Sequence, residues 1–244
     1  MRCSWWSTSN FLFFPVALLL CLDALRLSNR IILASAGPMC GCASHFDVLM
    51  DFFNATGGPT WTIRSGWGAS LASPCTTSSW YGVTCVDGNI TSLDLSGNNL
   101  KGTLPPSLGN LSQLQFLNLY INRISGTLPA SYGQRLVSIQ QISMHSNQFA
   151  GSLPDSWGAL PRLTYLNLDF NRLNGTLPGE PWSTSSLLTS LSLNYNSLSG
   201  TLPESWGHSM STMTYLQLTS NVRHTPLCLG LELGFVDASG RSIV

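Results

Sequence analysis

Charged side chains are scarce in this sequence. Only 9% of its 244 residues are Asp, Glu, Lys or Arg, against about 25% in an ordinary globular protein, and eleven basic residues balance eleven acidic ones. Lys101 is the only lysine. A nucleic-acid-binding protein carries a clustered basic patch, so the composition argues against a nucleic-acid partner. Disordered chains combine high net charge with low hydrophobicity, whereas 43% of this chain is hydrophobic, so we expect a folded protein.

The sequence also lacks an apolar run long enough to span a membrane. The N-terminal run covers residues 11–22, whereas a membrane-spanning helix needs about 20 residues. A basic residue, Arg2, precedes this run and the small-residue motif Ala34-Ser35-Ala36 follows it, which predicts a secretory signal over residues 1–36. Cleavage nearer Ala24 and an uncleaved signal anchor are the alternatives, and no other transmembrane segment is expected. The protein is therefore predicted to be secreted or to lie at the cell surface.

The residues after the predicted signal agree with export. An oxidising compartment favours disulfides, and an odd number of cysteines leaves one unpaired. The five that remain are Cys40, Cys42, Cys75, Cys85 and Cys228. Four N-x-[ST] sequons are predicted glycosylation sites, at Asn54, Asn89, Asn110 and Asn174.

From Ile90 onward the sequence repeats itself. The repeat is L-x-x-L-x-L-x-x-N-x-L-x-G-x-L-P, and five full copies and one partial copy fill residues 90–221. Each of the first five asparagines is followed four residues later by glycine, and then by a Leu-Pro pair. The repeat asparagines are Asn98, Asn122, Asn147, Asn171, Asn196 and Asn221.

The residue types of the repeat predict a solenoid. The L-x-L core is a short strand with inward leucines, and the asparagine amide can bond backbone groups of neighbouring coils where the chain turns. One repeat cannot bury its leucines alone, so the coils must stack. We therefore predict an α/β fold, a right-handed solenoid with a parallel sheet on its concave face.

These repeats resemble the plant-type subclass of leucine-rich-repeat proteins. The resemblance extends to an N-terminal cap, which we place at residues 37–89, with Leu49 and Phe52-Phe53 on a capping helix and a C-x(n)-W-x-G-V-x-C motif that ends at Cys85. The family's cap disulfide would then join Cys75 to Cys85. The Gly-Thr-Leu-Pro motif and the Glu-Ser-Trp-Gly and Asp-Ser-Trp-Gly segments look most like those of trypanosomatid surface antigens.

The C-terminal segment 222–244 departs from the pattern. Arg223 stands where the sixth repeat should have leucine, and apolar residues then alternate between Leu227 and Phe235, as in a half-buried strand. The segment is either an atypical cap or a truncated or frame-shifted copy of the repeat. Six strands at about 4.8 Å each place Cys228 too far from the cap for a disulfide. We therefore expect it to be free or to link a dimer, while Cys40 and Cys42 bond each other or pair outside the chain.

Catalytic chemistry is not expected. The sequence shows no metal-ligand spacing, phosphate-binding glycine loop or nucleophile elbow, and no cofactor is predicted. Ser143, His145 and Asp169 fall close together in the repeat register, but no oxyanion donors accompany them. An exposed polar ladder explains these three residues better than a catalytic triad does.

The outward strand positions point to a recognition function. They are polar, nearly uncharged and rich in aromatic residues, which suits binding of a protein or glycan. We place the centre of the binding surface at Phe116, Tyr120 and Tyr165, which we expect on adjacent strands; packing of the aromatics against one another is the alternative. The protein is predicted to be a non-enzymatic adhesion or recognition module, with an ectodomain fragment of a receptor-like or inhibitor leucine-rich-repeat protein as the alternative. The full predicted ligand-binding set is Phe116, Tyr120, Tyr165, Asp169, Phe170, Tyr195 and Tyr215.

Overall fold

The computed structural model describes residues 42–68, 74–75, 80–180, 182, 187–209 and 212–221, all within one compact unit. The predicted signal, the segment 222–244, Cys40 and Cys228 lie outside these residues. In the described part of the chain, no helix combines the length and apolar character needed to cross a membrane.

The first sheet holds one strand from each coil. Its strands from β2 onward are parallel and in register, and the apolar residue at the centre of each strand is buried. The prediction of a parallel sheet is thus confirmed, with one addition: β1 pairs with β2 antiparallel, so a hairpin forms the edge of the sheet. The strands, in spatial order, are β1 (Val83–Val86), β2 (Asn89–Asp94), β4 (Phe116–Asn118), β6 (Gln141–Ser143), β8 (Tyr165–Asn167), β10 (Ser190–Ser192) and β12 (Tyr215–Gln217).

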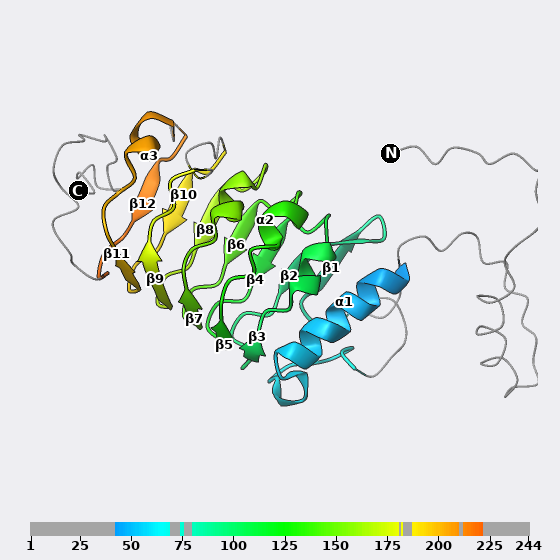
Figure 1. Ribbon diagram of the computed structural model, residues 1–244. Coiled ribbons are helices and arrows are strands. Elements are labelled where there is room, and N and C mark those ends of the chain that lie inside the picture. Colours follow the sequence, from blue (N-terminus) through cyan, green and yellow to red (C-terminus); the bar gives the residue numbers. More distant parts are fainter. Residues whose placement is uncertain are drawn as a thin grey trace, which may run out of the picture. The chain divides into compact units, whose positions relative to one another are not determined.

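A second parallel sheet, which the sequence analysis missed, forms from the residues after each repeat asparagine. In the first coil Leu100 is buried whereas Lys101 and Thr103 are exposed, and the same alternation recurs in later coils. This extended segment pairs with its equivalent in the next coil with an offset of two residues, so that Lys101 pairs with Arg123 and Ser125 with Gln148. The strands are β3 (Lys101–Thr103), β5 (Arg123–Gly126), β7 (Gln148–Gly151), β9 (Arg172–Thr176) and β11 (Ser197–Ser199); Figure 1 shows both sheets.

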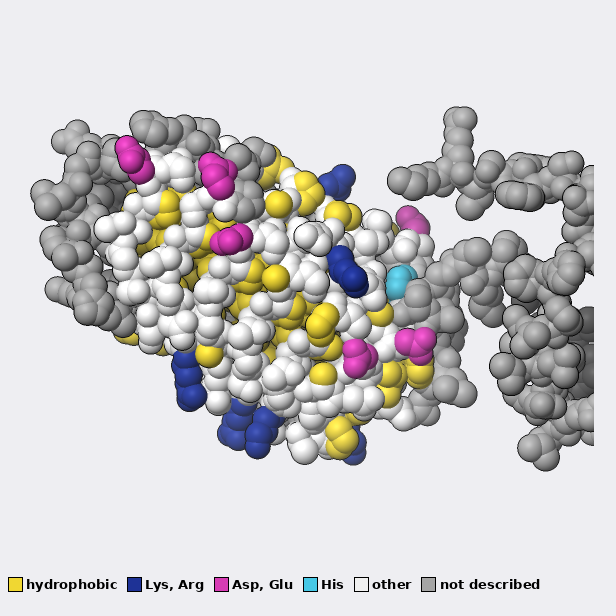
Figure 2. Space-filling model, in the orientation of Figure 1, with side chains coloured by type: hydrophobic (Ala, Val, Ile, Leu, Met, Phe, Trp, Pro, Cys, Tyr) yellow, Lys and Arg dark blue, Asp and Glu magenta, His cyan; other side chains and the backbone are white. Residues whose placement is uncertain are grey.

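Short helical turns form a third side of the solenoid, each after a Leu-Pro pair. Figure 2 shows a band of hydrophobic side chains running along the coils on this side. Gly133 lets two coils approach, because a Cβ there would lie 2.1 Å from the carbonyl oxygen of Ser156. The turns are η3 (Pro106–Asn110), α2 (Tyr132–Arg135), η4 (Asp155–Ala159) and α3 (Glu204–Ser209).

An aromatic ladder runs inside these turns. Tyr132, Trp157, Trp182 and Trp206 are buried at equivalent positions of successive coils. Each donates a hydrogen bond to the proline carbonyl of the preceding coil, over 2.9 to 3.0 Å. The tryptophan of the Ser-Trp-Gly segments therefore supplies both apolar volume and a hydrogen bond between coils.

The repeat asparagines form a second ladder. The Asn147 carbonyl oxygen accepts from the Ile124 N–H at 3.0 Å, and its amide donates to the carbonyls of Leu119 and Met144 at 2.9 and 3.1 Å. Asn122, Asn171 and Asn196 make equivalent bonds in their own coils. The asparagine thus satisfies buried backbone groups at the turn, as the sequence pattern predicts.

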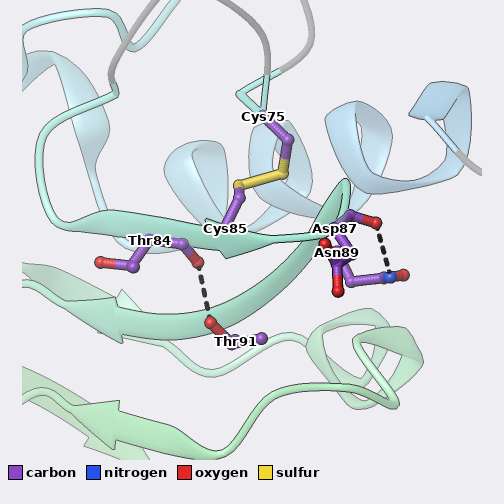
Figure 3. The surroundings of a disulfide bond; sticks show 6 residues. All are labelled: Cys75, Thr84, Cys85, Asp87, Asn89 and Thr91. Carbon is purple, nitrogen blue, oxygen red and sulfur yellow. Dashed lines mark hydrogen bonds between the residues drawn. A yellow bond between two sulfur atoms is a disulfide. The ribbon is translucent and has the colours of Figure 1, made fainter.

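The N-terminal cap covers the first coil. Helix α1 (Cys42–Ala55) buries Leu49 and Phe52 completely, and the single turn η2 (Gly58–Thr60) leads into a cluster of aromatic rings that includes Trp61, Trp67 and Trp80. Cys75 and Cys85 are joined by a disulfide, the pairing that the family resemblance implies. Figure 3 shows this bond linking the loop at Cys75 to strand β1 beside the cap helix.

Candidate functional site

The candidate site is the outward surface of the first sheet, and its register corrects one prediction. Phe116 pairs with Gln141, and Gln141 pairs with Tyr165. Phe116 and Tyr165 therefore lie two strands apart, and the expectation that they share adjacent strands is wrong. In this register position aromatic residues alternate with smaller polar ones as far as Tyr215, so these rings do not form one cluster.

Instead, two pairs of stacked rings lie in the segments that directly follow the strands of the first sheet. The rings of Tyr120 and His145 are 4.7 Å apart with an interplanar angle of 9°, and those of Phe170 and Tyr195 are 4.3 Å apart at the same angle. These four residues thus partly fit the alternative that the outward aromatic residues pack against one another. Phe170 and Tyr195 still expose 52% and 51% of their surface, so the second pair remains available for contact with another molecule.

The residue before each repeat asparagine has a left-handed backbone. The φ angles are 55° at Ile121, 53° at Phe170 and 52° at Tyr195, and Ser146 and Ser220 adopt similar values. A left-handed backbone is costly for bulky and β-branched residues. The asparagine ladder accounts for the geometry, since the chain must turn sharply to bring each amide beneath the neighbouring coil. The consequence is that Ile121, Phe170 and Tyr195 project outward on a constrained backbone.

Asp169 faces the next coil rather than His145. Its carboxylate accepts from the Ser192 hydroxyl at 2.7 and 2.8 Å and from the Asn194 backbone N–H at 2.6 Å. His145 instead bonds the Ser146 hydroxyl through Nδ1 at 3.2 Å. The carboxylate is therefore engaged away from the imidazole, and Ser143, His145 and Asp169 do not have the bonding pattern of a catalytic triad.

The charge on the imidazole follows from its surroundings. Burial lowers the pKa of His145 below its ordinary value of 6.5, and the Coulombic attraction of Asp169 opposes this shift only in part. The lowered pKa favours the neutral imidazole, which stacks on the ring of Tyr120.

A second hydrogen-bonded carboxylate lies near the cap. Asp94 accepts from the hydroxyl of Ser96 at 2.8 Å and from the Asn118 amide at 3.2 Å. Asp94 thus ends β2 and Asp169 follows β8, and the Tyr120–His145 stack lies in the two coils between them. No group of three or more His, Cys, Asp or Glu residues placed to hold a metal occurs within the described ranges.

The predicted glycosylation sites lie away from the stacked rings. Asn54 is on α1, Asn110 ends η3 and Asn174 is on β9, and all three are exposed. Asn89 begins β2 at the cap end, where its amide donates to the Asp87 carbonyl at 3.1 Å (Figure 3). Glycans at these positions would leave the outward surface between β4 and β12 uncovered.

Comparison with known proteins identifies the repeats. The Leucine Rich Repeat family model matches residues 89–111, 162–183 and 187–209. Leucine-rich repeat protein 1 of rice, Oryza sativa subsp. indica, is 38% identical over 98 residues, which are 40% of this chain and 44% of that protein. The chain thus spans less than half of this curated relative.

Solved plant structures share the fold. The Arabidopsis receptor kinase HAESA, in complex with the peptide hormone IDA and the co-receptor SERK1, is 30% identical with a TM-score of 0.64; the match covers 73% of this chain and 29% of that one. The BIR3–SERK2 complex of Arabidopsis thaliana matches at 28% identity and a TM-score of 0.62, over 72% of this chain and 92% of that one.

These likenesses support a plant-type leucine-rich-repeat protein. The fold resembles the extracellular domains of plant receptor kinases and is consistent with ligand binding. The relative and structures named above are plant proteins, and they give no support to the likeness to trypanosomatid surface antigens.

Proposed function

We propose that the protein is a non-enzymatic recognition module, secreted or at the cell surface, that binds a protein or glycan through the outward face of its first sheet. The observation that carries this proposal is the Phe170–Tyr195 stack, in which two half-exposed rings project from left-handed turns. Rigid aromatic side chains lose little conformational entropy on binding and tend to dominate the energy of an interface.

The polar surroundings of the stack support the same function. Asp169, Ser192 and Asn194 form a hydrogen-bonded network one residue position away, so their polar groups are held in place before a ligand arrives. Preorganised polar groups beside an apolar anchor reduce the entropic cost of binding. The binding of the peptide hormone IDA in the HAESA complex gives a precedent in a related fold.

The test is a binding screen of the purified protein against arrays of glycans and of extracellular proteins and peptides. A variant carrying Phe170→Ser and Tyr195→Ser copies Ser146 and Ser220, which occupy the same position in other coils, so it should fold. We expect it to lose at least tenfold in affinity for any ligand found, because the anchor rings are removed.

Val137→Ser provides a matched control. Val137 exposes 45% of its surface, but it lies just beyond Leu136, the C-cap residue of α2, in the part of the coil that carries the helical turns. Its replacement should leave affinity unchanged. If the double variant binds as tightly as the unaltered protein, the site lies elsewhere on the solenoid.

The alternative is that the chain is the ectodomain portion of a receptor-like or inhibitor protein, which the receptor kinase structures favour. Immunoblotting of the native protein separates the two proposals. A species no larger than the 26.4 kDa calculated for the full sequence, allowing for glycans and signal cleavage, in the medium supports a free module. A much larger species confined to membranes supports a receptor.

A further inference from the structure

A second surface of the solenoid has a distinct charge. The second-sheet face comprises residues 98–103, 122–127, 147–152, 171–176 and 196–201, and it contains no Asp or Glu. Lys101, Arg123 and Arg172 all lie on it, so it holds three of the six Lys and Arg residues that the structure describes. All three side chains are exposed, and within the described residues none of them forms an ion pair or hydrogen bond.

The cations follow the order of the coils. Lys101 and Arg123 are direct partners on the neighbouring strands β3 and β5. Arg172 occupies on β9 the repeat position that Arg123 occupies on β5, with Gln148 at that position on the strand between them. The pairing is offset by two residues in each coil, because Gln148 pairs with Ser125 and Arg172 with Ala150. The two arginines are therefore about 10 Å apart across the strands and a further ~13 Å apart along them.

Hydroxyl groups run beside the cations. Each coil presents an exposed Thr or Ser directly after its repeat glycine, and the half-buried Gln148 adds an amide on the strand between the two arginines. The exposed hydroxyl residues are Thr103, Thr127, Ser152, Thr176 and Thr201. The face therefore carries an exposed hydroxyl group in each coil and three positive charges among them.

Acidic residues lie on another side. Asp155, Glu180 and Glu204 occupy the segments after the Leu-Pro pairs in three successive coils. Figure 2 shows dark blue side chains gathered along one edge of the described coils, where β3 to β9 lie in Figure 1, and magenta ones set apart from them. The chain as a whole is neutral, so the positive character of this face comes from segregation of charge.

We infer that the second-sheet face binds a linear sulfated polysaccharide, laid along the solenoid axis across the coils. A polymer with anionic groups at regular intervals can meet the repeated cations, and the hydroxyl and amide groups between them can bond the sugar hydroxyls. Association with such a polyanion releases its counterions and is therefore favoured at low salt.

Other polyanionic partners fit this face less well. The large apolar residues of the face, such as Leu100, Ile124 and Phe149, are buried, so no apolar side chain is available to enter a lipid bilayer. For the same reason the face offers no exposed aromatic ring on which unpaired bases could stack. Hydroxyls and amides interspersed with cations match a sugar polymer.

Heparin is the probe, and binding is measured by calorimetry over a series of salt concentrations. The test variant carries Arg123→Gln and Arg172→Gln, which copy Gln148 from the coil between them. Loss of two cationic contacts should reduce the slope of log affinity against log salt by about two and weaken binding at least tenfold near physiological salt. Arg162→Gln is the matched control, since Arg162 is exposed but lies outside this face, and it should bind as the unaltered protein does.

The predicted glycosylation site Asn174 lies on the same face, so every protein in the comparison carries Asn174→Ser, which copies Ser199 of the next coil. The protein with Asn174→Ser alone is the reference for the other variants. The proposal is overturned if the double variant binds heparin normally, if Arg162→Gln weakens binding equally, or if desulfated heparin or phosphatidylserine vesicles bind as well as heparin. The variant with Phe170→Ser and Tyr195→Ser should retain heparin binding. Its loss of heparin binding would assign the polysaccharide to the first-sheet face and overturn the inference as well.

Discussion

At the scale of single residues, the solenoid depends on side chains that replace missing backbone partners. Each repeat asparagine sits where the chain leaves a strand and neighbouring backbone groups have no ladder partner. Asn147 is 8% exposed, and its two amide atoms bond backbone groups of its own coil and of the preceding one. A leucine of similar size would fill the space but leave those buried groups unpaired, at a cost of about 1–3 kcal/mol each.

Asn147→Leu and Asn147→Ala should therefore destabilise the protein by similar amounts, about 3 kcal/mol or more, because the lost hydrogen bonds dominate over the lost volume. Urea denaturation measures the free energy of unfolding. Gln148→Ala, a change at the neighbouring half-buried residue, should cost less than about 0.5 kcal/mol. A much smaller loss for Asn147→Leu than for Asn147→Ala would show that packing, and not hydrogen bonding, explains the residue.

Tyr132 provides a test that depends on pH. Burial, followed by the negative charge of Asp51, raises the pKa of Tyr132 far above its ordinary value of 10.0. The folded state keeps a proton that the unfolded chain releases above pH 10, so this contribution is complete below pH 10 and is lost as the pH rises further. Tyr132→Phe removes it, together with the bond to the Pro105 carbonyl.

We expect Tyr132→Phe to cost about 1–2 kcal/mol at pH 7, since the proline carbonyl loses its partner. Above pH 10 the variant should lose stability less steeply than the unaltered protein. Denaturation series at pH 8, 10 and 11 measure both effects. Equal slopes above pH 10 would show that the Tyr132 hydroxyl is accessible to solvent.

At the scale of elements, the spacing of the repeat predicts the solenoid and its first sheet. The features that arise from contacts between neighbouring coils are not predicted in the same way. The 24- to 25-residue spacing of the asparagines indicates the solenoid, and the L-x-L core predicts the first sheet. The second sheet could have been inferred from the buried Leu100 and exposed Lys101 pattern that recurs after each asparagine. The left-handed turns could not, because nothing in Ile121 or Phe170 favours that backbone, and the surrounding coils impose it.

The turn before Asn122 is therefore a place where the fold tolerates strain. Asparagine adopts a left-handed backbone more readily than β-branched isoleucine does, so Ile121→Asn should stabilise the protein by about 1 kcal/mol. Val137→Asn, at a similarly exposed residue without positive φ, should change stability by less than about 0.5 kcal/mol. Thermal unfolding measures both variants, and a destabilised Ile121→Asn would mean that the isoleucine makes compensating contacts. Reduced ligand affinity in a stabilised variant would assign a binding role to Ile121.

At the scale of the whole molecule, each coil contacts mainly its two neighbours, so stability is close to a sum of coil and interface contributions. Hydrogen bonds between coils recur once per repeat, in the asparagine ladder, the aromatic ladder and both sheets. The cap differs, because α1 and the aromatic rings around Trp67 shield only the first coil. Weakening the cap should thus affect the near end of the solenoid first.

Removal of the cap disulfide tests this arrangement. The bond links residues ten apart in sequence, and on the chain-entropy model its loss in a Cys75→Ser and Cys85→Ser variant should cost about 2–3 kcal/mol. In a quasi-one-dimensional solenoid that cost falls on the nearest coil, so amide hydrogen exchange should accelerate most in β1 and β2. Strands β8 and β10 should keep their protection, because their neighbours on both sides are unchanged. A uniform acceleration across all the strands would instead show that cap and coils unfold as one cooperative unit, so that the disulfide stabilises every coil equally.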